Sequence, residues 1–143
     1  MQSNPKVTQI EVSRLLLDSQ NPRLPSIQIT SHDAIRAMTE RQGNKVLALA
    51  EHLLENGANP ANLMMVIPAK SDPNFFVVLD GNRRLNALKL LESPQLAEGT
   101  LSEKDLRKLK KLSRDFESSP IQKFSFVVFD SRDEADVWIS LTH

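Results

Sequence analysis

The stretch that decides the fold is residues 75–91, which read FFVVLDGNRRLNALKLL. The first five residues are aromatic, β-branched or leucine, a composition typical of a buried strand. This apolar run ends at Asp80-Gly81, and the leucines after it recur at the spacing of an amphipathic helix. The sequence therefore predicts a strand, a glycine turn and a helix in direct succession.

This arrangement predicts a phosphate-binding corner at residues 80–84. The first backbone N–H groups of a helix have no intrahelical partner, and the helix dipole attracts anions to them. Arg83 and Arg84 stand in the expected first turn. There a cation is unfavourable, unless it binds an anion through paired hydrogen bonds. Asp80 has two interpretations that stay open: a cap of the helix, or a ligand of Mg²⁺ beside bound phosphates.

Composition narrows the class of protein. The chain has 143 residues, enough for one domain over residues 1–143, and its 18 basic and 18 acidic residues cancel. Dedicated DNA-binding domains usually carry a basic excess. The absence of cysteine excludes disulfides, thiolate metal sites and cysteine catalysis, and fits a reducing compartment. Because neither a signal peptide nor a membrane-length apolar stretch is present, we expect a cytoplasmic protein without membrane contact.

Hydrophobic periodicity predicts an α+β fold. Strands are expected at residues 7–12, 63–67, 75–79 and 124–129, with a hairpin loop at 68–74. Helices are expected at residues 31–41, 45–55, 83–92, 100–114 and 133–141. Thr100 and Glu103 have the spacing of a capping box, and Asp130 or Ser131 is the expected cap of the last helix. Trp138 is expected in the core.

Three motifs in order resemble the N-terminal domain of the ParB/sulfiredoxin-like superfamily. They are the turn Asn21-Pro22-Arg23, a helix that ends at Gly57, and the box Gly81-Asn82-Arg83-Arg84 followed by Ala87. The resemblance covers residues 10–91, and the preceding Asp80 makes the box similar to the Asp-Gly-X-X-Arg variant. It implies a mixed sheet with flanking helices.

The resemblance also implies nucleotide binding. In ParB proteins this box holds the phosphates of CTP, and relatives include an ATP-using reductase, a serine kinase and domains of defence systems. Carried over, it makes Gly81, Asn82, Arg83 and Arg84 phosphate contacts, with Arg23 and Gly57 as further nucleotide contacts. Asp80 becomes the catalytic and Mg²⁺-binding candidate. The expected ligand is an NTP, CTP or ATP, with Mg²⁺, and the expected chemistry, if any, is NTP hydrolysis or phosphoryl transfer. Sulfiredoxin chemistry is excluded because the box has no cysteine.

Two departures from the family pattern matter. Asn82 replaces the glutamate of the ParB box, so Asp80 would have to supply the carboxylate for Mg²⁺. A degenerate, inactive pocket is therefore also an open interpretation. In ParB proteins a second phosphate box follows the helix expected here at residues 133–141. We accordingly expect residues 1–143 to be an N-terminal fragment of a longer protein.

A basic segment supports a rival hypothesis of DNA binding or nuclease action. Six basic residues lie within the expected helix at 100–114: Lys104, Arg107, Lys108, Lys110, Lys111 and Arg114. Such a segment is usually the solvated side of a helix that buries its leucines. DNA, contacted through the intact protein, stays an alternative partner to the nucleotide, and a homodimer is also left open. The three histidines lack the spacing of a metal site.

Overall fold

The computed structural model describes residues 6–18, 31–56, 63–70, 72–118 and 123–142. Within these ranges the chain forms five strands and five α-helices, so the predicted α+β class is confirmed. The strands are β1 (Lys6–Glu11), β2 (Leu15–Leu17), β3 (Met64–Pro68), β4 (Phe76–Asp80) and β5 (Lys123–Val128). They join in one sheet in the order β1-β5-β3-β4-β2.

The sheet is mixed. β1 pairs antiparallel with β5, and β3 pairs antiparallel with β4, which confirms the predicted hairpin. β3 runs parallel to β5, and β2 runs parallel to β4. β2 has only three residues and pairs with β4 alone, so this edge of the sheet needs contacts beyond the ladder to fix it.

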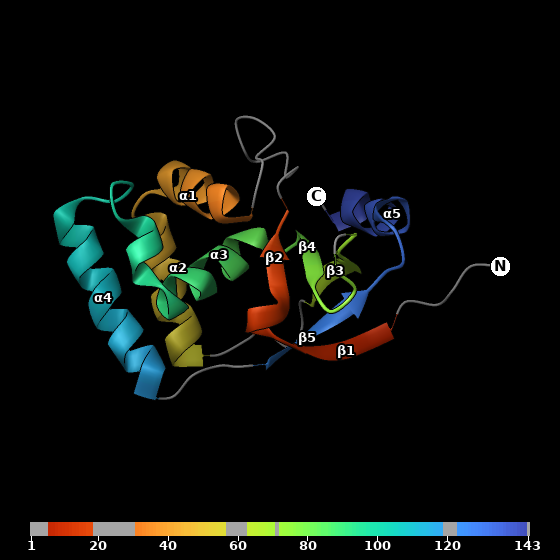
Figure 1. Cartoon of the computed structure of the whole chain (residues 1–143), viewed down its shortest axis with the longest axis horizontal. Coiled ribbons are helices and arrows are strands. Elements are labelled where there is room, and N and C mark those ends of the chain that lie inside the picture. The colour runs from red at the N-terminus through yellow and green to blue at the C-terminus, as the bar shows by residue number, and fades with distance from the viewer. Residues whose placement is uncertain (1–5, 19–30, 57–62, 71, 119–122, 143) are drawn as a thin grey trace.

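The helices divide between the two sides of the sheet. Four of them gather on one side (Figure 1): α1 (Ser31–Gln42), α2 (Lys45–Asn56), α3 (Asn82–Glu92) and α4 (Glu103–Ser118). On the other side, α5 (Arg132–Thr142) lies against β3 and β4. Two short 3₁₀ helices, η1 (Val12–Arg14) and η2 (Pro94–Ala97), complete the described elements.

The core lies between the sheet and the group of four helices. α3 runs through its centre and packs against α1, α2 and α4. The predicted inward residues Leu85, Leu88 and Leu91 are all fully buried. Ala87 and Leu90 are buried too, because neighbours surround this helix on more than one face. The strand–turn–helix unit therefore starts inside the sheet and continues into the core.

Several local predictions need correction. α4 begins at Glu103, and Ser102 Oγ accepts from the Asp105 N–H at 3.2 Å, whereas the Thr100 hydroxyl donates to the Ala97 carbonyl at 2.7 Å. The capping box from Thr100 is therefore wrong, because a turn separates Thr100 from the helix. Trp138 is 52% exposed, so its expected place in the core is wrong as well.

The cap of α5 agrees with the sequence prediction, whereas strand β2 was not predicted. The Ser131 hydroxyl oxygen accepts from the Glu134 N–H at 3.3 Å, which makes Ser131 the cap of α5. β2 was not predicted because three leucines are too short to show a period. None of the described helices is both long and apolar enough to cross a membrane.

Candidate functional site

The predicted corner is a tight turn between β4 and α3. Gly81 is the N-cap of α3, with φ of +109°, and its carbonyl accepts from the Leu85 N–H at 3.0 Å. A Cβ placed on Gly81 would lie 2.3 Å from Cγ of Met64 on the neighbouring strand. Only glycine fits both the backbone angle and this contact. Gly81 is therefore the one residue between the end of β4 at Asp80 and the start of α3 at Asn82.

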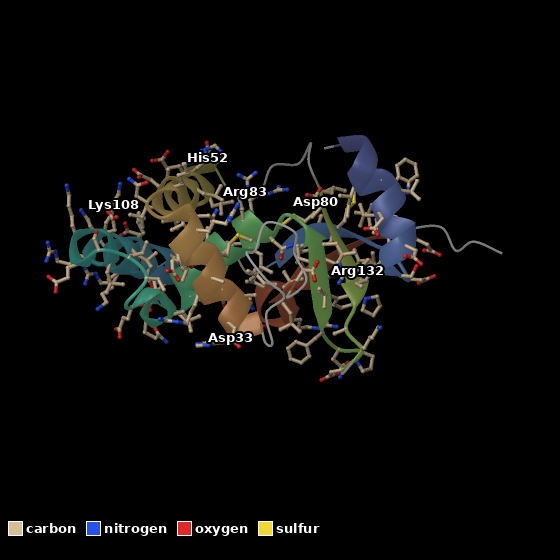
Figure 2. All side chains as sticks on the ribbon, turned by 90° about the horizontal axis from the view of Figure 1, so that it is seen from above. Asp33, His52, Asp80, Arg83, Lys108 and Arg132 are labelled. Atoms are coloured by element: carbon tan, nitrogen blue, oxygen red, sulfur yellow. The ribbon has the colours of Figure 1, made fainter. Side chains whose placement is uncertain are left out.

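The two arginines of the corner have different surroundings. Arg83 is exposed, whereas Arg84 is partly buried. Burial lowers the pKa of the Arg84 guanidinium, and the nearby carboxylate of Asp80 acts in the opposite direction. Arginine nevertheless remains charged in proteins. Figure 2 shows Asp80 and Arg83 on the two sides of the turn, Asp80 on the strand and Arg83 on the helix. The corner thus combines two cations, one carboxylate and a helix N-terminus.

Asp80 does not occupy the capping position. That position belongs to Gly81, which has no side chain and makes no side-chain cap bond. Of the two interpretations of Asp80, capping at the N-cap is therefore disfavoured. No group of three His, Asp or Glu side chains among the described residues could hold a metal ion. A Mg²⁺ ion at the corner would need phosphate oxygens beside Asp80, as is usual for Mg²⁺ bound with a nucleotide.

Asn82 is built into the fold. It is 4% exposed, its Oδ1 accepts from the Asp18 N–H at 3.0 Å, and its Nδ2 donates to the Val78 carbonyl at 2.8 Å. Its carboxamide therefore joins the end of β2, strand β4 and the first turn of α3. The longer, charged glutamate of the ParB box could not donate to the Val78 carbonyl in this way. A direct phosphate contact from Asn82 stays a prediction.

A partly buried ion pair that the sequence did not predict lies beside the corner. Arg132, the first residue of α5, donates from Nη1 and Nη2 to the carboxylate of Asp18 at 2.8 and 3.0 Å. The Asp18 side chain is 4% exposed and that of Arg132 is 37% exposed. These bonds raise the pKa of the Arg132 guanidinium, while its partial burial acts in the opposite direction. Because 114 positions separate the two residues, local sequence gave no signal for the pair.

A cavity of about 670 Å³ opens on the α5 side of the sheet. Its apolar floor comes from alternate strand positions, among them Leu16, Ile67 and Val77. Asp18 and Arg132 form part of its wall, and Lys70, Asp130 and Asp133 add further charges. Leu15, Val66 and Val78, one position away in each strand, are buried toward the core. The cavity therefore lies on the face of the sheet opposite the helical core.

The remaining predicted sites differ in what the structure says of them. Arg23 and Gly57 lie outside the described residues, so their nucleotide contacts stay predictions. The basic residues of α4 are all exposed. Lys108 pairs with Glu51 at 3.4 Å and Lys110 with Glu98 at 4.0 Å, and Figure 2 shows Lys108 in the helical part, away from the labelled corner residues. The corner and the basic side of α4 are therefore separate candidate sites.

Comparison of the chain with family models, with curated proteins and with solved structures found no match. The functional interpretation of the corner therefore depends on three observations. They are the order of the motifs, the geometry of the turn between β4 and α3, and the charges that this turn brings together.

Proposed function

We propose that this chain is a nucleotide-binding domain of the ParB/sulfiredoxin-like type, which binds the phosphates of an NTP at the corner between β4 and α3. The observation that carries the proposal is the Gly81 turn. It starts a buried helix without a side-chain cap and sets Arg83 and Arg84 in its first turn. Two guanidiniums at the positive end of a helix dipole are unfavourable, and the single carboxylate of Asp80 offsets only part of their charge, so the corner favours a bound anion.

Each group of the corner has a proposed role. The N-terminal N–H groups of α3 donate to phosphate oxygens, and Gly81 lets the backbone approach them closely. The Arg83 and Arg84 guanidiniums bind further phosphate oxygens through paired hydrogen bonds. Asp80 would supply a carboxylate oxygen to a Mg²⁺ ion bound together with the phosphates. If the domain is an enzyme, positioning and charge neutralisation at these groups would drive NTP hydrolysis or phosphoryl transfer.

Calorimetry tests this proposal directly. The chain is titrated with CTP, ATP and GTP, each with and without Mg²⁺, and we expect saturable binding of at least one nucleotide. The matched pair of variants is Arg83→Ala with Arg84→Ala at the corner, against Arg107→Ala with Arg114→Ala on α4. We expect only the corner pair to abolish binding. Absence of binding by the unmodified chain, or equal loss in both pairs, would contradict the proposal.

One observation favours a second candidate, nucleic-acid binding through α4. The residues that this helix buries, Leu109, Ser113 and Phe116, lie on one side, and all six basic residues lie in the exposed remainder. Such an array is the electrostatic footprint of a phosphate-backbone contact. The ion pairs with Glu51 and Glu98 offset part of this charge. A nuclease role for this helix stays a prediction, and the candidate proposed here is binding.

A further inference from the structure

Hydrogen bonds connect α5 to the corner through Asp18, which contacts Arg132 of α5 and Asn82 of α3. Arg132 holds the carboxylate of Asp18 with both terminal nitrogens, and the N–H of Asp18 donates to Oδ1 of Asn82 at 3.0 Å. Asn82 is the first residue of α3 and immediately precedes Arg83. A side chain on one face of the sheet is thus connected to the helix N-terminus that carries the phosphate-binding groups.

This connection is more rigid than a surface ion pair. A two-bond contact between guanidinium and carboxylate fixes distance and orientation together. Asp18 and Asn82 are each nearly inaccessible, at 3% and 4% exposure, so water does not readily replace their bonds. The ladder alone fixes the end of β2 poorly, since β2 contributes three residues and pairs with one strand. By binding the Asp18 carboxylate, Arg132 therefore holds the end of β2 in a position that the strand pairing alone would not fix.

We propose that Asp18 and Arg132 are positioning residues for the corner: their ion pair fixes the Asp18 amide against Asn82 and so sets the orientation of the first turn of α3. The consequence for phosphate affinity rests on the proposed function. Neither residue needs to touch the nucleotide. Reactive or binding groups lose much of their effect when their supporting residues are removed, because small displacements weaken several directional bonds at once.

The test uses the whole chain and three changes at the pair. Arg132→Met removes both hydrogen bonds that the guanidinium donates to the Asp18 carboxylate. Arg132→Lys keeps the positive charge but cannot donate two parallel hydrogen bonds from a planar group. Asp18→Leu combined with Arg132→Met removes both charges and keeps the Asp18 backbone N–H. Glu51→Gln is the control, because it breaks the exposed pair with Lys108 on α4. Circular dichroism first confirms that each variant is folded at the temperature used.

Two readouts separate positioning from general destabilisation. In calorimetry, we expect Arg132→Met to weaken nucleotide binding about tenfold or more, Arg132→Lys to weaken it less, and Glu51→Gln to leave it unchanged. In ¹H–¹⁵N NMR spectra without nucleotide, we expect Arg132→Met to shift the Asn82 side-chain amide and the Arg83 and Arg84 backbone amides. Glu51→Gln should leave these signals in place.

The outcomes are distinguishable from failure of the proposed function. If the unmodified chain binds no nucleotide, the proposed function fails, and the NMR comparison alone decides the positioning role. Unmoved corner signals in folded Arg132→Met overturn the inference whatever the chain binds. Nucleotide affinity in that variant within twofold of the unmodified chain overturns it as well. Should Arg132→Met fail to fold, the charge-free double variant and Arg132→Lys provide the same two comparisons.

Discussion

Asn82 and Asp18 are joined by a hydrogen bond of 3.0 Å across 64 positions of the chain, from the Asp18 N–H to the Asn82 side-chain oxygen. The other end of the same carboxamide donates to the Val78 carbonyl at 2.8 Å. One asparagine thus satisfies a backbone donor and a backbone acceptor inside the protein. A carboxamide as buried as that of Asn82 would be destabilising without such partners.

Asn82→Asp should lower stability in a pH-dependent way. An ionised carboxylate cannot donate to the Val78 carbonyl, so we expect a loss of about 1–3 kcal/mol at neutral pH. Burial raises the pKa of the introduced carboxyl, whereas the helix N-terminus and the Asp18 N–H lower it. We expect burial and the Val78 carbonyl, which only the protonated form can satisfy, to outweigh them and to keep this pKa above its unfolded value of about 3.9. Stability is then closest to that of the unmodified chain below about pH 3.9, and it is lost as the pH rises through the folded-state pKa.

Urea unfolding of both proteins from pH 4 to pH 8 measures this difference. Asn44→Asp is the control, because Asn44 is exposed and precedes α2, where aspartate is equally acceptable. A constant stability difference across the pH range for Asn82→Asp would contradict the assigned hydrogen bonds.

Gly81→Ala should be among the most destabilising small substitutions. The positive φ of +109° disfavours any side chain, and the new Cβ would lie 2.3 Å from Met64 Cγ. We expect a loss of about 2–5 kcal/mol, from about 1–2 for the backbone conformation and about 1–3 for overpacking. The matched control is Gly43→Ala: Gly43 has φ of +58° and no atom within 4 Å of a Cβ, so about 1–2 kcal/mol is expected. Equal losses in thermal unfolding would show that the Met64 contact is unimportant.

The sequence was sufficient for most of the elements and for the turn between β4 and α3, because their signals are local. Residues 75–91 contain a buried strand, a glycine and a leucine helix, and each of these is visible within a few positions. The roles of Asn82 and Asp18 depended on contacts between distant segments. Asn82 looked like a missing carboxylate, whereas its carboxamide is occupied by the end of β2 and by β4. No periodicity could indicate that Arg132 would reach Asp18.

The exposed tryptophan illustrates the same limit. Val137 and Trp138 fit an apolar helix face in the sequence, yet they are 60% and 52% exposed. Among the described helices, α5 alone lies on its side of the sheet. It buries Ala135, whereas Val137 and Trp138 face outward. Periodicity describes which residues share a face but does not say how much of that face a neighbour covers.

Arg83→Ala should raise stability while it weakens nucleotide binding. Removing a cation from the first turn of a helix is worth about 0.3–1 kcal/mol. Loss of a charge-assisted phosphate contact is worth about 1.5–3 kcal/mol, or about tenfold to a hundredfold in affinity. Thermal unfolding and calorimetry on one preparation measure both effects. Arg114→Ala, in the C-terminal half of α4, is the control for the higher helix propensity of alanine. If Arg83→Ala stabilises the protein no more than Arg114→Ala does, the helix dipole does not disfavour Arg83.

Any DNA binding by this chain should depend on α4 and on salt. Replacing Arg107, Lys111 and Arg114 with glutamine removes exposed charges without removing an observed ion pair. If these residues contact phosphates, the slope of log affinity against log salt should fall by about one for each charge removed. Fluorescence anisotropy with a labelled duplex at several salt concentrations gives that slope. Absence of binding at low salt, or an unchanged slope in the triple variant, would remove this candidate.

The Asp18–Arg132 pair should be far more important for stability than any surface pair. Arg132→Met removes the Arg132 guanidinium from a carboxylate that is 4% exposed, so we expect a loss of about 3–5 kcal/mol. Combining it with Asp18→Leu should recover most of that loss, because an apolar pair no longer buries a charge. Glu51→Gln, which breaks the exposed pair with Lys108, should change stability by less than about 1 kcal/mol. Denaturant unfolding of all four proteins completes the comparison. A double variant as unstable as Arg132→Met would contradict this explanation. The ion pair itself would then stabilise the contact between the end of β2 and α5, and the buried charge of Asp18 would not be the cause of the loss.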